Sequence, residues 1–116
     1  MKRQIAERNG RRAETIAAWW LRLHGWRIRG VRVRTPVGEV DLIARRGRIV
    51  AFIEVKARAT AAELDLAIDR RRLTRVAAAA NFLAARHAGL RDDIRIDVML
   101  IAPRRLPRHL VNIWHG

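Results

Sequence analysis

The segment Gly38-Glu39-Val40-Asp41-Leu42-Ile43-Ala44 is followed, after a short gap, by Arg48-Ile49-Val50-Ala51-Phe52-Ile53-Glu54-Val55-Lys56. Both segments are rich in Val, Ile and Phe, a composition that predicts two β-strands. Arg45-Arg46-Gly47 lies between them and predicts a hairpin turn. The rest of the predicted fold is arranged around this hairpin.

Each predicted strand of the hairpin carries two charged residues at alternate positions. Glu39 and Asp41 belong to the first strand, and Glu54 and Lys56 belong to the second. Side chains at i and i+2 of a strand lie on the same face. A turn with an even number of residues would therefore place both pairs on one face. An odd number would place them on opposite faces, unless a bulge restored the register.

A shared face would bring three carboxylates together, which repel one another and are costly to desolvate. A divalent cation, Mg²⁺ or Mn²⁺, would remove the conflict, because carboxylates are ligands for such hard cations. Lys56 could then orient or deprotonate a metal-bound water, or hold a phosphate oxygen. This set predicts hydrolysis of a phosphodiester. The alternative is that Glu54 and Lys56 are ordinary strand charges, paired with Glu39, Asp41 or an arginine.

The lysine itself supports the metal interpretation. Lys2 and Lys56 are the only lysines among the 25 Lys and Arg residues of the sequence. Arginine is permanently protonated, whereas lysine can act as a base when its surroundings favour the neutral form. The rare residue type thus occurs where proton transfer would require it.

The hairpin also resembles a known family. Gly-Glu-Val-Asp-Leu-Ile followed by Phe-Ile-Glu-Val-Lys-Ala-Arg is similar to the signature of the bacterial YraN-like family. That family is placed in the PD-(D/E)XK nuclease superfamily, near the archaeal Holliday-junction resolvases. The resemblance implies a restriction-endonuclease-like fold with Asp41, Glu54 and Lys56 as the catalytic acid, acid and lysine. Asp41 and Glu54 would hold the metal, with Glu39 as a supporting carboxylate.

Composition limits the partners. The formal net charge is +14 in 116 residues, which favours a polyanion and most simply DNA. No apolar run near 18 residues and no signal-peptide pattern occurs, so we expect a cytoplasmic protein without a membrane partner. The absence of cysteine agrees with that location. The oligomeric state is open, and a homodimer is compatible with the sequence. The four histidines have no metal-ligand spacing and are expected in ordinary surface or packing roles: His24, His87, His109 and His115.

The N-terminal third predicts a helix and a strand. Residues 1–9 are expected to be a flexible basic segment, followed by a helix from Arg11 to His24 that Gly25 caps. Within this helix Glu14 would pair with a neighbouring arginine, or, as the resemblance implies, contribute to the metal site. A strand should follow over residues 26–34, with a bulge at Gly30 because the apolar alternation shifts there. Its arginines at 27, 29, 32 and 34 would form a solvated face or contact phosphates.

The C-terminal half predicts a helix and one or two strands. Thr60 to Glu63 has the spacing of a capping box, Asp69 is a second N-cap candidate, and the main helix should span residues 70–86. The arginines of its first turn, Arg70 to Arg72, could be a solvated helix end or a phosphate-binding cluster, at a position where the YraN-like family has lysine. A strand over 95–101 should follow, with an Arg95–Asp97 ion pair. A last edge strand over 109–115 would carry Trp114 as a packing residue or a stacking platform for a base.

Together these elements predict one α/β domain over residues 1–116, in the order α-β-β-β-α-β and a final β, with helices flanking a mixed sheet. The predicted function is a metal-dependent DNA endonuclease acting on branched or structured DNA. The alternative is a nucleic-acid-binding module that keeps the nuclease fold with little or no turnover. An accessory subunit with a protein partner is a third hypothesis. The residues expected to contact nucleic acid are Arg32, Arg34, Arg58, Arg71, Arg72 and Arg95.

Overall fold

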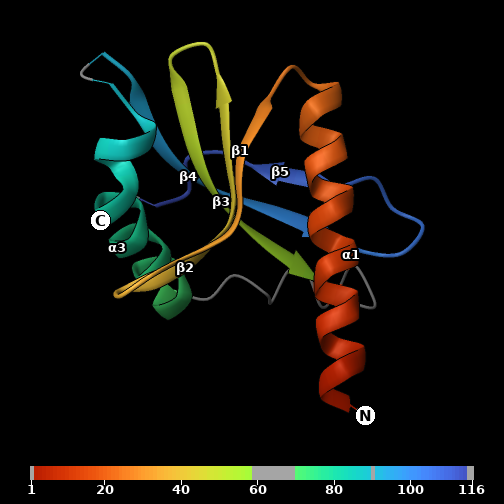
Figure 1. Ribbon diagram of the computed structural model, residues 1–116. Coiled ribbons are helices and arrows are strands. Elements are labelled where there is room, and N and C mark those ends of the chain that lie inside the picture. Colours follow the sequence, from red (N-terminus) through yellow and green to blue (C-terminus); the bar gives the residue numbers. More distant parts are fainter. Residues whose placement is uncertain (1, 59–69, 90, 115–116) are drawn as a thin grey trace.

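A computed structural model describes residues 2–58, 70–89 and 91–114, with the backbone alone described for residues 2–10. One mixed sheet lies between two helices (Figure 1). Its strands are β1 (Arg27–Thr35), β2 (Gly38–Arg46), β3 (Ile49–Ala57), β4 (Asp93–Ile101) and β5 (Arg108–Leu110). The helices are α1 (Lys2–Leu23) and α3 (Arg70–His87). The predicted order of elements and the α/β class are confirmed.

The five strands lie in the order β1-β2-β3-β4-β5. β1, β2 and β3 are antiparallel, and β4 runs parallel to β3, as the connection through α3 requires. The bulge predicted near Gly30 is confirmed by a register shift between Ile28 and Gly30 in the β1–β2 pair. β5 is shorter than the predicted edge strand and pairs only with β4 within the described residues.

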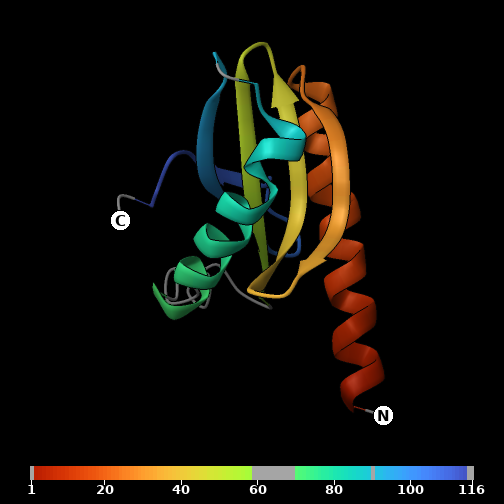
Figure 2. The ribbon, with the colours of Figure 1, turned by 60° about the vertical axis from the view of Figure 1, so that its left-hand side comes forward.

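The two helices cover opposite faces of the sheet, as Figure 2 also shows. α3 packs Leu73, Val76 and Leu83 against one face, where Phe52 is fully buried. α1 packs small residues and Leu21 against the other face. Alanines on α1 and on the facing strands allow this helix to approach the sheet closely: Ala13, Ala17 and Ala18 on α1, and Ala44 and Ala51 on β2 and β3.

The N-terminus of α1 differs from the prediction. The helix begins at Lys2 and not at Arg11, so residues 2–9 are helical and Gly10 lies inside the helix. One glycine costs only about 1 kcal/mol in a helix that continues on both sides. The C-terminus agrees with the prediction: Gly25 has φ +87°, and its N–H donates to Arg22 O while the Trp26 N–H donates to Leu21 O. These two bonds form the capping motif that a left-handed glycine permits.

The hairpin turn is shorter than predicted. β2 extends to Arg46, and the turn consists of Gly47 and Arg48, with Gly47 at φ +60°. The turn therefore has an even number of residues, which is the condition for placing the charged pairs of the two strands on one face of the sheet. The predicted helical turn at 60–63 and the candidate cap at Asp69 lie outside the described residues.

Candidate active site

The acidic residues of the hairpin lie where the β2–β3 ladder ends. Regular pairing runs from the Arg46–Ile49 pair to the Leu42–Ile53 pair. At the next position of β2, the Asp41 Oδ2 accepts a hydrogen bond of 2.8 Å from the Val55 N–H. The end of the ladder therefore fixes the Asp41 carboxylate against β3.

Asp41 is in a crowded acidic environment. Burial raises the pKa of Asp41 most, the Val55 N–H opposes that rise, and the charges of Glu54 and Glu14 add to it. Arg72 lowers it only in part, and the resulting pKa is about 6. Asp41 therefore experiences the negative charge of one carboxylate on β3 and of another on α1. The three acids come from β2, β3 and α1.

Glu54 is the most buried of the three acids, at 2 % exposure. Its Oε1 lies 3.3 Å from Lys56 Nζ and also accepts a short hydrogen bond from Arg72 Nε of α3. In the described part of the chain, its Oε2 is buried and has no hydrogen-bond partner. A buried carboxylate oxygen without a partner is costly, and a bound water or ion would satisfy it.

Glu14 reaches the cluster from α1. Its partner is Arg32 of β1, with Nε at 2.5 Å from Oε1 and 3.1 Å from Oε2. The predicted pairing with a neighbour on the same helix is therefore wrong. No sequence signal identified the true partner, because the two residues are 18 positions apart and meet only through the packing of α1 on the sheet.

Glu39 lies apart from this cluster. Its side chain is 44 % exposed and lies 3.5 Å from Arg34, whose side chain is 84 % exposed. Exposed pairs of this kind contribute little to stability. Glu54 thus contacts Lys56, and Asp41 experiences the charges of Glu54 and Glu14, whereas Glu39 pairs with Arg34 at the surface.

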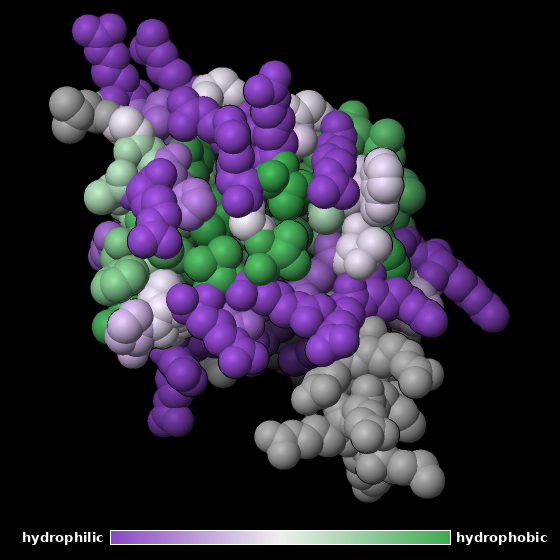
Figure 3. Space-filling model, viewed as in Figure 1, coloured by the Kyte–Doolittle hydropathy of each residue, from purple (hydrophilic) through white to green (hydrophobic). Residues whose placement is uncertain are grey.

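The arginines predicted to contact nucleic acid differ in how far their side chains are exposed to solvent. Arg34, Arg58 and Arg71 are exposed, and Arg72 is half-exposed beside Glu54. The face drawn in Figure 3 is covered mainly by hydrophilic side chains, with apolar surface between them. The exposed guanidinium groups of Arg34, Arg58 and Arg71 can meet a polyanion directly.

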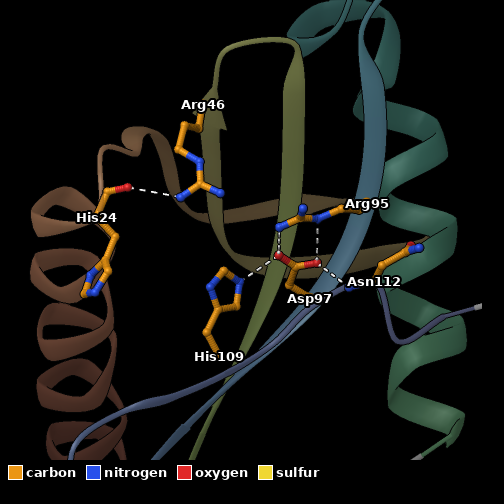
Figure 4. Close-up of polar contacts among 6 residues, drawn as sticks. All are labelled: His24, Arg46, Arg95, Asp97, His109 and Asn112. Carbon is orange, nitrogen blue, oxygen red and sulfur yellow. Dashed lines mark hydrogen bonds and ion pairs between the residues drawn. The ribbon is translucent and has the colours of Figure 1, made fainter.

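Arg95 belongs instead to a buried polar cluster on β4, which Figure 4 shows. Asp97 is fully buried and accepts hydrogen bonds from Arg95, from His109 Nε2 at 2.7 Å and from the Asn112 N–H at 2.8 Å. The predicted Arg95–Asp97 ion pair is confirmed, and we no longer place Arg95 among the nucleic-acid contacts. The cluster attaches the chain from β5 to Asn112 to the centre of the sheet.

The remaining predictions about aromatic and histidine residues concern packing. Trp114 lies outside β5, packs against the core cluster under α3, and has the Arg70 guanidinium 5.6 Å from its ring centre. Packing rather than base stacking is therefore the role that its contacts support. His24 lies against Trp20 and bonds to its carbonyl, so it is a surface packing residue as predicted. His115 lies outside the described residues.

This architecture defines a protein of the restriction-endonuclease-like fold: a mixed sheet between two helices, with an acid-acid-lysine set at the end of a central hairpin. A solved structure of the same fold is that of Hjc from Archaeoglobus fulgidus, a Holliday junction resolvase, with a TM-score of 0.61 and 20 % identity. The match covers 86 % of this chain and 73 % of that one. At this identity the likeness establishes the fold alone.

The chain belongs to a family described as Uncharacterised protein family UPF0102, whose profile matches residues 13–101. A member from Sphingopyxis alaskensis is 74 % identical over 114 residues, covering 98 % of each chain. Another from Caulobacter vibrioides is 48 % identical and covers 96 % of this chain and 90 % of its relative. The resemblance seen in the hairpin is confirmed over most of the sequence.

Proposed function

We propose that the protein is a metal-dependent endonuclease that acts on DNA, in particular on branched or structured DNA. The observation that carries the proposal is the buried Glu54 carboxylate beside Lys56, with an Asp41 whose pKa is raised to about 6 by burial and by the charges of Glu54 and Glu14. The net charge of +14 supports a polyanionic substrate. The likeness in fold to a Holliday junction resolvase supports DNA as that polyanion.

The acidic residues fit a divalent cation by donor type. All three offer carboxylate oxygens, which Mg²⁺ and Mn²⁺ prefer, and the buried Oε2 of Glu54 has no partner among the described residues. No three acidic or histidine side chains in the described ranges are already arranged as a metal site. Loading would therefore require Glu14 and Glu54 to turn from their arginine partners toward the ion. When bound, such an ion lowers the pKa of a coordinated water and stabilises charge that develops on the phosphate.

The other residues have distinct roles in this proposal. Asp41 is held by the Val55 N–H and, with a pKa of about 6, is ionised above neutral pH. Lys56 orients the attacking water, accepts its proton, or holds a phosphate oxygen. Arg34, Arg58, Arg71 and Arg72 contact the DNA backbone, which requires no base recognition. The proposal includes a cytoplasmic location and leaves room for a homodimer, in which two sites could act on two strands.

One observation favours the alternative of a binding module with little or no turnover. Glu14 and Glu54 are already paired with Arg32 and Arg72, and these cations offset the negative charge without a metal. If these pairs persist when DNA binds, the fold would bind nucleic acid without cleaving it. The two functions share the same surface and differ in whether a metal enters.

Cleavage of junction, flap, duplex and single-stranded DNA in Mg²⁺ and Mn²⁺ tests the proposal, with Lys56→Arg as the decisive variant. This variant keeps the charge, but its guanidinium is larger and permanently protonated. We expect cleavage to fall about a hundredfold or more while DNA binding persists. Equal cleavage by the variant would show that Lys56 is not catalytic. A wild type that binds every substrate and cleaves none would establish the binding module.

The binding assay has its own signature. If about six phosphates are neutralised, affinity should fall roughly a thousandfold between about 50 and 200 mM salt. A flat salt response would remove the nucleic-acid interpretation for both functions.

A further inference from the structure

A groove of about 360 Å³ lies between α1 and β1, beside the acidic cluster. Arg11, Glu14, and Arg22 of α1 line one wall, at the three- and four-residue multiples that place them on one helical face. Val31 and Arg32 of β1 line the other wall, and Leu42 of β2 lies at its base. Three arginines and one carboxylate line the groove, so its lining carries a net positive charge that suits an anion.

Arg32 is the residue that connects the groove to the acidic cluster. Its backbone has φ +49°, in the left-handed region that non-glycine residues rarely adopt. Residues held in such conformations concentrate at functional sites. Its side chain contacts Glu14 through Nε and is 35 % exposed, whereas the Glu14 side chain is 11 % exposed. Solvent, and a ligand arriving from it, can thus reach Arg32 more readily than the acid it covers.

We propose that this groove is a phosphate subsite for the DNA backbone. When a phosphodiester binds there, Arg32 forms an ion pair with the phosphate and no longer with Glu14. The exchange frees the Glu14 carboxylate for the divalent cation. This inference rests on the proposed function, because it assumes that DNA and metal both bind. It assigns Arg11 and Arg22 to the phosphate, and makes Arg32 a positioning residue that acts through Glu14.

The exchange couples two binding events. Without DNA, the Arg32–Glu14 pair competes with the metal for Glu14. When DNA is bound, Arg32 pairs with the phosphate and no longer competes with the metal for Glu14. DNA therefore raises the affinity for the metal, and the metal raises the affinity for DNA by the same factor. Couplings of this kind are commonly about 5- to 150-fold.

The test measures Mn²⁺ affinity by calorimetry, with and without a saturating synthetic DNA junction. Every protein carries Lys56→Arg so that the DNA stays intact. In this background, DNA should raise Mn²⁺ affinity about tenfold. Arg32→Gln should raise Mn²⁺ affinity without DNA and remove most of the further gain on adding DNA. Arg32→Gly should do the same, and because glycine adopts φ +49° freely, it guards against a folding defect in the glutamine variant.

Two controls separate the exchange from a general loss of positive charge. Arg27→Gln removes an exposed arginine of the same strand that does not line the groove, and its DNA-dependent gain should remain tenfold or so. In a Glu14→Gln background, Arg32→Gln should no longer change Mn²⁺ affinity, since the carboxylate it covers is gone.

The outcomes distinguish the two proposals. If Mn²⁺ and DNA both bind but Arg32→Gln behaves like Arg27→Gln, the subsite and its exchange are wrong while the nuclease proposal stands. If the wild-type protein, tested with Mn²⁺ alone and with DNA in a chelator, binds no Mn²⁺ or no DNA, both are wrong.

Discussion

Replacing Asp41 by Asn should stabilise the metal-free protein, although the substitution removes a candidate catalytic group. The native carboxyl group has its pKa raised from 3.8 to about 6 by burial and by the charges of Glu54 and Glu14. The ionised form is therefore disfavoured in the folded state relative to the unfolded chain. Asparagine is nearly the same size, and its carbonyl oxygen can still accept the Val55 N–H.

The magnitude follows from the pKa shift. A rise of about two units corresponds to about 3 kcal/mol of lost stability once the group is ionised in both states. Asp41 is not fully enclosed, and the new amide must find partners, so we expect a gain of roughly 1–3 kcal/mol at pH 8. For a chain of this size, each kcal/mol raises the melting temperature by about 4 °C.

The pH dependence identifies the cause. Below pH 3.8 the Asp41 carboxyl is protonated in both states, and the substitution should have little effect. As the pH rises from about 4 to about 6, the unfolded chain releases this proton first, so wild type loses stability relative to the variant. Above pH 6 or so the difference should be constant.

Urea unfolding in a chelator between about pH 4 and 8, followed by tryptophan fluorescence, measures this difference. Asp93→Asn is the matched control, because Asp93 is exposed at the start of β4, and it should change stability by less than about 0.5 kcal/mol. A variant no more stable than wild type at pH 8, or a gain that does not vanish at low pH, would refute the crowded acidic site.

Three further predictions concern the metal and the Asp97 cluster. Mg²⁺ or Mn²⁺ should raise the melting temperature of wild type but not of Asp41→Asn, because a ligand that binds only the folded state stabilises it; an equal rise in both proteins would place the metal elsewhere. Burial raises the pKa of Asp97, but hydrogen bonds from His109, Arg95 and the Asn112 N–H outweigh burial and leave the pKa below its ordinary value. The stability that ionised Asp97 contributes should therefore be lost as the pH falls through this lowered pKa. Asp97→Ala should cost about 3–5 kcal/mol in urea unfolding at pH 7, since it leaves Arg95 buried without its anion, and a cost below about 1 kcal/mol would contradict the role of the cluster.

The hairpin, α3 and β4 could be predicted from sequence because their signals are local. Alternation of apolar residues defined the strands, the stripe through Leu73, Val76 and Leu83 defined α3, and Gly25 defined the end of α1. The even turn that brings Asp41 to Glu54 was one of two alternatives that the sequence left open. Turn length depends on how far strand pairing continues past Ala44, and composition does not determine that.

The partners of the buried acids could not be predicted, because they depend on how distant elements pack. The separation is 18 positions both between Glu14 and Arg32 and between Glu54 and Arg72. In each pair, one residue belongs to a helix and the other to a strand. In a sequence with so many arginines, no pattern distinguishes the one that reaches a given carboxylate. The same excess makes Arg95 indistinguishable in sequence from a nucleic-acid contact, although its side chain is only 16 % exposed.

The energetic cost of the acidic cluster is itself an argument for function. Glu54 is buried with one carboxylate oxygen that has no hydrogen-bond partner among the described residues, and burial together with the charges of Glu54 and Glu14 raises the Asp41 pKa. Replacing buried ionic sets by apolar side chains often leaves a protein equally stable or more stable, so stability does not explain this arrangement. A nucleic-acid-binding surface would need the arginines but would gain nothing from a partly buried Asp41 and a buried Glu54, since carboxylates repel the phosphates. A site that binds a cation between the acids and the phosphate uses both sets of charges, and this is why we favour the endonuclease over the binding module.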